Sequence, residues 1–410
     1  MNVTTMLQLA SRNTLRRPAR TAFTAGMVMV SVALLLIAIS LLGGIFGQIL
    51  KDGIAGAGDV RIAEREFVQR EETLPLYSNL GEVETLAKAV EQVEGVRAAE
   101  PRIMTGVTVT VGEEFGDLFA RVIGANERYF VERSHLKDKL VAGGWFTGAS
   151  GELVAGKWVV DQLHAKVGDE LVLLGTTQDG SMSSLKGRLV GVVHGAGLEQ
   201  AIMLPLERAQ YLTDLPGAAT ELLVYGDDYQ QAGVLAARLR TLPALQPRAV
   251  QAWNERDPWK AITGTVQGVM GLMIFIIGLL TALGIWNTMT MTVLERTSEL
   301  GVLRAMGLSR PRLVVLVLLE AVAISVAGGA VGVALGAIPA WVLSTRGIHY
   351  GARIAADATI GISETMYGEF DATIVTRCFL LGVVMAVAGS LVPALRAASI
   401  QPVTAMRSGR

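Results

Sequence analysis

Two short segments of this 410-residue chain resemble enzyme motifs. Gly151–Trp158 has the glycine and lysine spacing of a P-loop, but Trp158 stands where a P-loop needs Ser or Thr to hold Mg²⁺. Ser183–Lys186 has the S-x-x-K spacing of penicillin-recognising enzymes, but neither companion motif of those enzymes is present. We interpret the first segment as a strand that enters a helix, and we predict no enzymatic activity on this chain.

The metal-binding and thiol chemistry of the chain is equally sparse. His135, His164, His194 and His349 lack HExxH or any other ligand spacing. Cys378 is the only cysteine, which excludes an internal disulfide, a thiolate zinc site and a redox dithiol. A net charge of −1 without a basic tract argues against nucleic acid as a partner. We expect no cofactor and no metal on this chain.

The distribution of charge indicates a membrane protein. Only 18% of the residues are charged, against about 25% in soluble domains. Asp, Glu, Lys and Arg are absent from residues 21–50, 261–294, 321–345 and 378–395. Because a helix needs about 20 apolar residues to cross the bilayer, the sequence predicts four transmembrane helices, one before and three after a long polar region. The first block is too long for the h-region of a signal peptide, so we expect an uncleaved span.

Arginines near the ends of the spans predict their orientation. They precede the first span, lie between the second and third, and follow the fourth: Arg12, Arg16, Arg17 and Arg20; Arg296, Arg304, Arg310 and Arg312; Arg396, Arg407 and Arg410. Positively charged flanks stay in the cytoplasm. We therefore expect an inner-membrane protein with both termini and the short loop between the second and third spans in the cytoplasm, and with its large domain outside.

The long polar region predicts an α+β extracytoplasmic domain. Strand, helix and strand patterns occur at 60–104 and again at 221–253, which predicts two βαβ units around a mainly β insertion. The expected boundaries are 1–20 (cytoplasmic amphipathic N-terminus), 21–50 (first span), 51–260 (outer domain, with flanks 51–104 and 216–258 and insertion 105–215), 261–294 (second span), 295–312 (cytoplasmic coupling helix), 313–345 (third span), 346–371 (outer loop), 372–395 (fourth span) and 396–410 (cytoplasmic tail).

Within the spans, small and polar residues stand out. Gly328, Gly332 and Gly336 recur at helical spacing, which favours close approach to another helix in lipid. Glu320 is an acidic residue in an apolar span, and with Asn287 it forms a candidate intramembrane polar site. Three roles remain open for Glu320: hydrogen bonding between helices, solvation among lipid headgroups, or direct coupling.

The segment between the second and third spans predicts a short amphipathic helix. Leu300, Leu303 and Met306 recur every three residues, Gly307 suits the residue after a helix end, and Ser309 suits the next N-cap. We expect this helix to dock on a partner protein. The alternative is that it lies on the lipid headgroups. The candidate coupling residues are Glu295, Arg296, Glu299, Leu300, Gly301, Leu303, Arg304, Met306 and Gly307.

Three stretches carry a family resemblance. Glu295–Gly307, the ending Pro393–Arg407 and the start Leu9–Pro18 resemble the corresponding segments of ABC-transporter permeases of the MacB, FtsX and LolC/LolE type. The resemblance covers the whole chain, and Asn287–Thr288 and Gly191–His194 look closest to the lipoprotein-releasing LolC/LolE branch. MacB itself carries a fused nucleotide-binding domain and FtsX usually has a smaller outer domain.

The resemblance implies a fold and a set of partners. The outer domain would consist of porter and sabre subdomains, and ATP and Mg²⁺ would be bound by a separate cytoplasmic ABC ATPase dimer. A second permease, either a copy or a paralogue, would complete the complex. The implied function is mechanotransmission that releases lipoproteins or related lipid cargo from the membrane to a periplasmic carrier. The alternatives are efflux of peptides, antibiotics or toxins with a periplasmic adaptor, and FtsX-like regulation of a cell-wall hydrolase.

Overall fold

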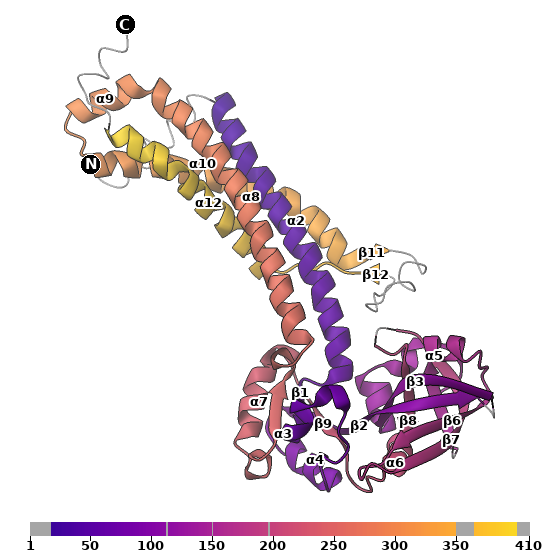
Figure 1. Ribbon diagram of the computed structural model, residues 1–410. Helices are drawn as coiled ribbons and strands as arrows, with labels where there is room; N and C mark the ends of the chain where they lie inside the picture. The colour runs from indigo at the N-terminus through magenta and orange to yellow at the C-terminus, as the bar shows by residue number, and fades with distance from the viewer. Residues whose placement is uncertain (1–17, 112–113, 150, 196, 350–364, 400–410) are drawn as a thin grey trace. The chain divides into compact units, whose positions relative to one another are not determined.

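The computed structural model describes residues 18–111, 114–149, 151–195, 197–349 and 365–399 (Figure 1). The chain separates into two compact units. Of the described residues, the helical unit comprises 18–47, 265–349 and 365–399, and the mixed unit comprises those within 48–264. Predictions for residues 1–17, 350–364 and 400–410 fall outside the described residues; they concern the amphipathic N-terminus, most of the outer loop and the end of the tail.

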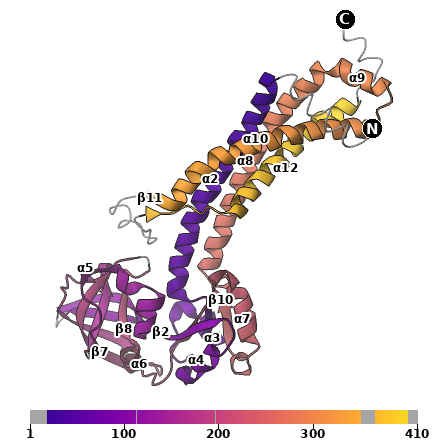
Figure 2. The same cartoon turned by 180° about the vertical axis from the view of Figure 1, so that it is seen from behind.

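Among the described residues, four long helices are apolar and long enough to cross a membrane. They are α2 (Pro18–Ala57), α8 (Trp259–Glu295), α10 (Arg310–Arg346) and α12 (Ala372–Ser399) (Figure 2). Each helix extends beyond its expected span, and α2 continues through Lys51 and Asp52. At 1.5 Å per residue, the 40 residues of α2 cover about 60 Å, roughly twice the hydrocarbon core, so charged residues can join the helix outside the lipid.

The glycine stripe of α10 lies directly on α2. Gly328, Gly332 and Gly336 are all buried. A Cβ atom added to Gly328 would come within 2.4 Å of the Ala25 carbonyl oxygen, and one added to Gly332 within 2.5 Å of the Met29 carbonyl oxygen. Only glycine permits two helix backbones to approach so closely, which is the packing mode favoured in lipid.

The chain between α10 and α12 also contacts α2. Its described ends form a short antiparallel pair, β11 (Ile348–His349) with β12 (Thr365–Met366). Next to this pair, the Glu369 amide donates a hydrogen bond to the Ser40 carbonyl oxygen of α2, at 2.8 Å. A Cβ atom added to Gly44 would lie 2.2 Å from the Tyr367 carbonyl oxygen. The end of this loop therefore packs against the middle of α2.

The two flanks of the mixed unit interleave in one antiparallel sheet. The first flank holds β1 (Val60–Ala63), α3 (Arg65–Gln69), α4 (Val83–Glu91) and the start of β2 (Val96–Val111), and the second holds β9 (Glu221–Gly226), α7 (Ala232–Arg240) and β10 (Ala249–Ala252). The strand order β10-β1-β9-β2 places a strand of the other flank between the two strands of each βαβ unit. This is the split βαβ arrangement.

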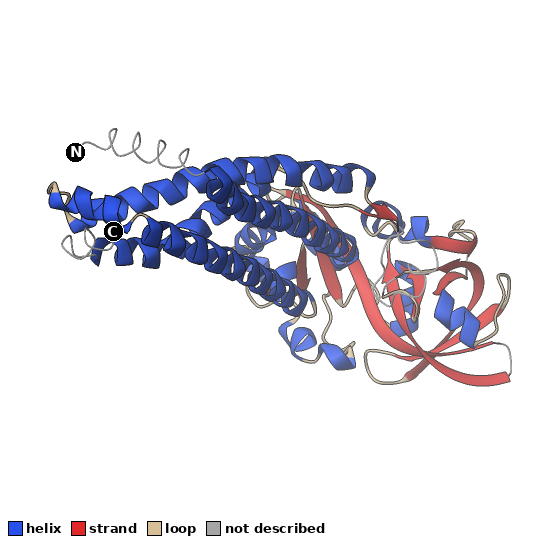
Figure 3. Ribbon diagram, turned by 90° about the horizontal axis from the view of Figure 1, so that it is seen from above, coloured by secondary structure: helices blue, strands red, loops and turns tan. Residues whose placement is uncertain are grey.

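The insertion closes on itself. It holds the rest of β2, then β3 (Glu114–Ala125), β4 (Leu140–Gly143), β5 (Glu152–Gly156), α5 (Lys157–Gln162), β6 (Glu170–Thr176), β7 (Met182–Val193), β8 (Ala201–Pro205) and α6 (Leu206–Thr213) (Figure 3). Pairing runs β2-β3-β8-β5-β7-β6 and returns from β6 to β2, which makes a six-stranded ring. The segment that resembles a P-loop is β5 running into α5, as predicted.

One core fills both parts of the mixed unit. Val60 and Ile62 of the flanking sheet and Leu153 and Leu173 of the ring are fully buried in the same cluster. Short helical turns connect the strands: η1 (Glu71–Thr73), η2 (Tyr129–Arg133), η3 (Leu136–Lys139), η4 (Tyr229–Gln231), η5 (Pro243–Leu245) and η6 (Trp253–Glu255). Four apolar helices with a large α+β domain confirm the predicted fold class.

Candidate coupling site

The segment between the second and third long helices folds as a short helix with a tight exit. Helix α9 covers Thr297–Ala305, which is shorter than the expected 295–312. Gly307 has φ +96°, a left-handed conformation that glycine adopts without strain. The Leu308 amide donates to the Leu303 carbonyl oxygen at 3.1 Å, as at many helix ends. Ser309 occupies the N-cap position of α10, but its side chain makes no capping hydrogen bond.

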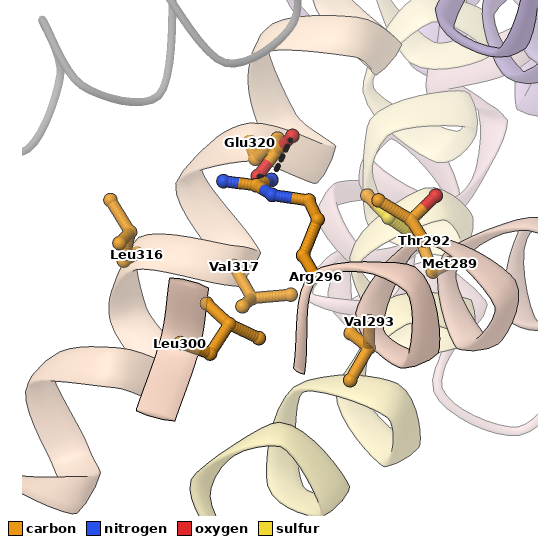
Figure 4. A pocket seen from close by; sticks show the side chains of 8 residues that line it. All are labelled: Met289, Thr292, Val293, Arg296, Leu300, Leu316, Val317 and Glu320. Carbon is orange, nitrogen blue, oxygen red and sulfur yellow. Dashed lines mark hydrogen bonds and ion pairs between the residues drawn. The ribbon is translucent and has the colours of Figure 1, made fainter. Parts of the chain in front are cut away.

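Arg296 lies at the centre of the site. One of its guanidinium nitrogens (Nη1) donates to both carboxylate oxygens of Glu320, at 3.0 and 3.1 Å (Figure 4). Its Nε donates to Glu299 at 3.1 Å. The Arg296 and Glu320 side chains are only 12% and 9% exposed. The hydrogen bond joins α10 to the junction of α8 and α9, and the three roles left open for Glu320 stay predictions. Removal of one partner from a buried pair leaves an uncompensated charge, which is strongly destabilising.

Glu295, the residue before Arg296, makes a second ion pair, in which the end of α8 supplies the negative charge instead of the positive one. Glu295 accepts a hydrogen bond from Arg20 at 2.6 Å, and both side chains are about 30% exposed. Arg20 belongs to the first turn of α2, and Glu320 belongs to α10. Consecutive residues of opposite charge therefore join the end of α8 to two different long helices.

Arg304 ties the other end of α9 to the fourth long helix. Its Nη1 donates to the Ala398 carbonyl oxygen at 2.7 Å, one residue before α12 ends at Ser399. A cation at the carboxyl end of a helix satisfies a free carbonyl and complements the helix dipole. With Arg296, this contact connects α9 to both α10 and α12.

The apolar face expected on α9 divides into buried and exposed parts. Leu300 is 3% exposed in a cluster with Val293, Leu313 and Leu316, and the half-buried Leu303 packs against that cluster. Met306 is 79% exposed. Leu300 and Leu303 therefore hold α9 on the permease itself, which corrects their expected place in a docking surface. The exposed face, here called the α9 outer face, consists of Ser298, Glu299, Val302, Ala305 and Met306.

The two candidate intramembrane polar residues lie apart. Glu320 lines the pocket of Figure 4 with Met289, Thr292, Val293, Arg296, Leu300, Leu316 and Val317. Asn287 is exposed and lines a different groove, together with Pro18, Ala19, Arg20, Phe23, Thr288, Met291 and Glu295. The structure brings together Arg296 and Glu320 but not Asn287 and Glu320. Arg20 enters the site unexpectedly, because the sequence marks it only as one arginine of a charged flank.

The chain is similar to known permeases in sequence. Residues 271–402 match the family model described as FtsX-like permease C-terminal, a range that includes α9, α10, α12 and most of α8. Over this range, about a third of its length, the chain is similar to FtsX-like permeases. Over 99% of its length it is 23% identical to the uncharacterized ABC transporter permease YknZ of Bacillus subtilis (strain 168), of which the match covers 100%.

Two further relatives are larger proteins. The chain is 27% identical to the pyoverdine export ATP-binding/permease protein PvdT of Pseudomonas fluorescens (strain Pf0-1), over 75% of this chain and 46% of that protein. It is 30% identical to the macrolide export ATP-binding/permease protein MacB of Neisseria meningitidis (strain DSM 15465 / Z2491), over 37% of this chain and 22% of that protein. The chain thus spans less than half of each. These relatives support the MacB and YknZ type of ABC permease and give no specific support to the LolC/LolE branch.

Similar solved structures align with about half of the chain. The periplasmic region of MacB from Actinobacillus actinomycetemcomitans aligns with 54% of this chain and 98% of its own, at 15% identity and a TM-score of 0.37. The extracellular domain of the YknZ transporter from Gram-positive bacteria aligns over 48% of this chain and 99% of its own length, at 15% identity and a TM-score of 0.34. Scores of this size do not by themselves define a shared fold.

Proposed function

We propose that this chain is the permease subunit of a MacB-type ABC transporter, and that it transmits ATP-driven movement from the cytoplasm to its mixed unit. The observation that carries the proposal is the attachment of α9. Two arginines and a buried leucine fix this short helix to α8, α10 and α12, while its α9 outer face stays exposed. A partner that pushes on this face displaces several long helices at once.

Long packed helices can carry a displacement from one end to the other. Helices α8 and α10 each have 37 residues, and the buried Arg296–Glu320 pair joins them at the α9 end. Packed interfaces of this kind change between discrete arrangements rather than deform continuously, so a small displacement at one end shifts an equilibrium at the other. ATP binding on the partner would supply the differential binding energy between the two arrangements.

We assign ATP and Mg²⁺ to a separate ABC ATPase dimer in the cytoplasm. Support comes from β5 and α5, where Trp158 replaces the residue that would hold Mg²⁺. The α9 outer face and both termini would lie in the cytoplasm, the mixed unit outside, and a second permease copy or a paralogue would complete the assembly.

For the cargo, we favour export of amphipathic small molecules or peptides. The two larger relatives are named for macrolide and pyoverdine export. A periplasmic adaptor that receives the cargo is part of this proposal. Lipoprotein release with a periplasmic carrier stays a prediction from the motifs, as does control of a cell-wall hydrolase. Depletion of the chain followed by fractionation of triacylated lipoproteins tests the lipoprotein alternative, because a normal inner-to-outer membrane distribution would exclude it.

The docking surface can be tested by placing a charge on it. Val302 is 46% exposed on α9, and Val234 is 56% exposed on α7 of the mixed unit, which makes a matched control. Val302→Asp should reduce co-purification of the cognate ATPase at least tenfold, while Val234→Asp should leave it unchanged. Both variants should insert in the membrane normally. Equal co-purification with the two variants would contradict the proposal.

A further inference from the structure

Side chains hold the carboxyl end of α2. The last carbonyl groups of a helix have no partner within the helix. Here the four consecutive carbonyl oxygens from Ala55 to Gly58 each accept a side-chain hydrogen bond. The donors are Tyr225 Oη to Ala55 (3.0 Å), Arg102 Nη1 and Tyr129 Oη to Gly56 (2.5 and 2.7 Å), and Arg256 Nη2 to Ala57 and Gly58 (2.9 and 3.0 Å).

These donors are buried and come from separate elements of the mixed unit. Arg102 belongs to β2, Tyr129 to η2 and Tyr225 to β9, and Arg256 lies between η6 and α8. Tyr129, Tyr225 and Arg256 are 2%, 7% and 6% exposed. Two guanidinium groups at this end of the helix also complement the negative end of its dipole. The end of α2 is therefore built into the mixed unit through a buried polar network, in which each bond is worth more than it would be in water.

A second network member fixes Arg102 in place. Glu221 accepts a hydrogen bond from Arg102 at 2.8 Å and lies 3.8 Å from Arg61, and its side chain is 2% exposed. Arg61 in turn donates to Glu71 at 2.5 and 2.9 Å. Arg102 thus has a carboxylate partner close by. Arg256 instead donates from one guanidinium nitrogen to the carbonyl oxygens of both Ala57 and Gly58.

Arg256 stands next to the first turn of α8. It precedes Trp259, the first residue of α8, by three positions, and its carbonyl oxygen accepts the Lys260 amide at 2.8 Å. The Trp259 ring packs against α2 so closely that a Cβ atom added to Gly53 would lie 1.8 Å from it. One residue therefore contacts the last turn of α2 through its side chain and the first turn of α8 through its backbone.

We propose that Arg256 is a positioning residue that joins the end of α2 and the start of α8 into one rigid joint of the mixed unit. This inference rests on the proposed function, since the joint is the place where movement of the long helices would enter the outer unit. Without the guanidinium group, the two helix ends would keep their own secondary structure but lose their fixed separation.

The experiment measures that separation in the full chain in lipid nanodiscs, without ATPase. In a Cys378→Ser background, spin labels at the exposed residues Asp52 and Lys260 report the joint, and labels at the exposed residues Lys186 and Glu207 report the ring as a control. Arg256→Gln should at least double the width of the 52–260 distance distribution and leave the 186–207 distribution unchanged. An unchanged 52–260 distribution in a folded Arg256→Gln protein would overturn the proposal.

If Arg256→Gln also broadens the 186–207 distribution, two milder variants test the role of Arg256 in the joint. Arg256→Lys keeps the charge and should recover part of the narrow distribution, and Tyr225→Phe removes only the bond to Ala55 and should broaden the distribution slightly. If neither variant changes the 52–260 distribution, the joint does not depend on these donors. Because no ATPase is present, this result is independent of the Val302→Asp test, so failure of the joint and failure of the proposed function can be told apart.

Discussion

Arg296 and Glu320, 24 residues apart in the sequence, form a buried ion pair in which one guanidinium nitrogen reaches both carboxylate oxygens. The pair joins the end of α8 to α10 inside the apolar part of the helical unit. Its neighbour Glu295 pairs with Arg20 at the surface. The two pairs differ in burial, and we therefore expect different contributions to stability.

The buried pair should contribute strongly to stability. We expect Arg296→Gln to lower the free energy of unfolding by about 3–5 kcal/mol, because it leaves the buried Glu320 carboxylate without its ion-pair partner. Glu320→Gln should cost less, because Arg296 keeps its hydrogen bond to Glu299. The exchange Arg296→Glu with Glu320→Arg should recover part of the loss. Thermal unfolding of the full chain in nanodiscs measures the effect, and purely additive losses in the double variant would contradict a direct pair.

The Arg20–Glu295 pair should be much weaker. Exposed ion pairs contribute about 0–1 kcal/mol and are screened by salt. A double-mutant cycle with Arg20→Gln and Glu295→Gln should therefore give a coupling energy below about 1 kcal/mol that shrinks as the salt concentration rises. A coupling energy as large as that of Arg296 and Glu320, and insensitive to salt, would show that the pair is buried in the working protein.

The glycine contact between α2 and α10 predicts a position-dependent effect of alanine. Gly332→Ala should lower stability by about 1–3 kcal/mol, because its Cβ would meet the Met29 carbonyl oxygen at 2.5 Å. Gly268 of α8 is the matched control, since no heavy atom among the described residues lies within 4 Å of its added Cβ. Gly268→Ala should be neutral or slightly stabilising. Equal losses at both positions would argue against close packing of α2 on α10.

Glu221 predicts a loss of stability in acid. Burial raises its pKa, but Arg102 and Arg61 together outweigh burial and hold the pKa below the ordinary value of 4.5. The carboxylate therefore stabilises the fold above pH 4.5, and this contribution disappears as the pH falls through the lowered pKa. Glu221→Gln should lower the melting temperature at pH 7, and its difference from the unchanged chain should shrink at acidic pH. A constant difference across this range would contradict the assignment.

Glu100 should have the opposite effect on stability: its charged form destabilises the fold. Burial raises its pKa above 4.5 more than Arg128, at 3.0 Å, lowers it. The charged form is therefore disfavoured in the fold, and stability falls as the pH rises from 4.5 through the raised pKa. Glu100→Gln should raise the melting temperature at pH 7 and have little effect below pH 4.5. A lower melting temperature at pH 7 would mean that the ion pair with Arg128 outweighs burial.

Sequence patterns predicted the elements more successfully than their contacts. The charge-free blocks predict the four long helices because desolvation forbids isolated charges in lipid, and the alternation of strands and helices predicts the split βαβ flanks. The burial of Leu300 was not predictable from α9 alone, since Leu300 and Met306 are equally apolar and only contact with α10 distinguishes them. The Arg20–Glu295 pair joins residues 275 positions apart, and a single sequence carries no signal for such a contact.

The central claim is that the α9 outer face and the mixed unit lie on opposite sides of the membrane. Met306 of α9 and Met182 of β7 test it directly, because they are 79% and 77% exposed. In a Cys378→Ser background, each is replaced by cysteine, and spheroplasts are treated with a membrane-impermeant maleimide. We predict that Met182→Cys is labelled in intact spheroplasts and that Met306→Cys is labelled only after permeabilisation; labelling of both without permeabilisation would contradict the account.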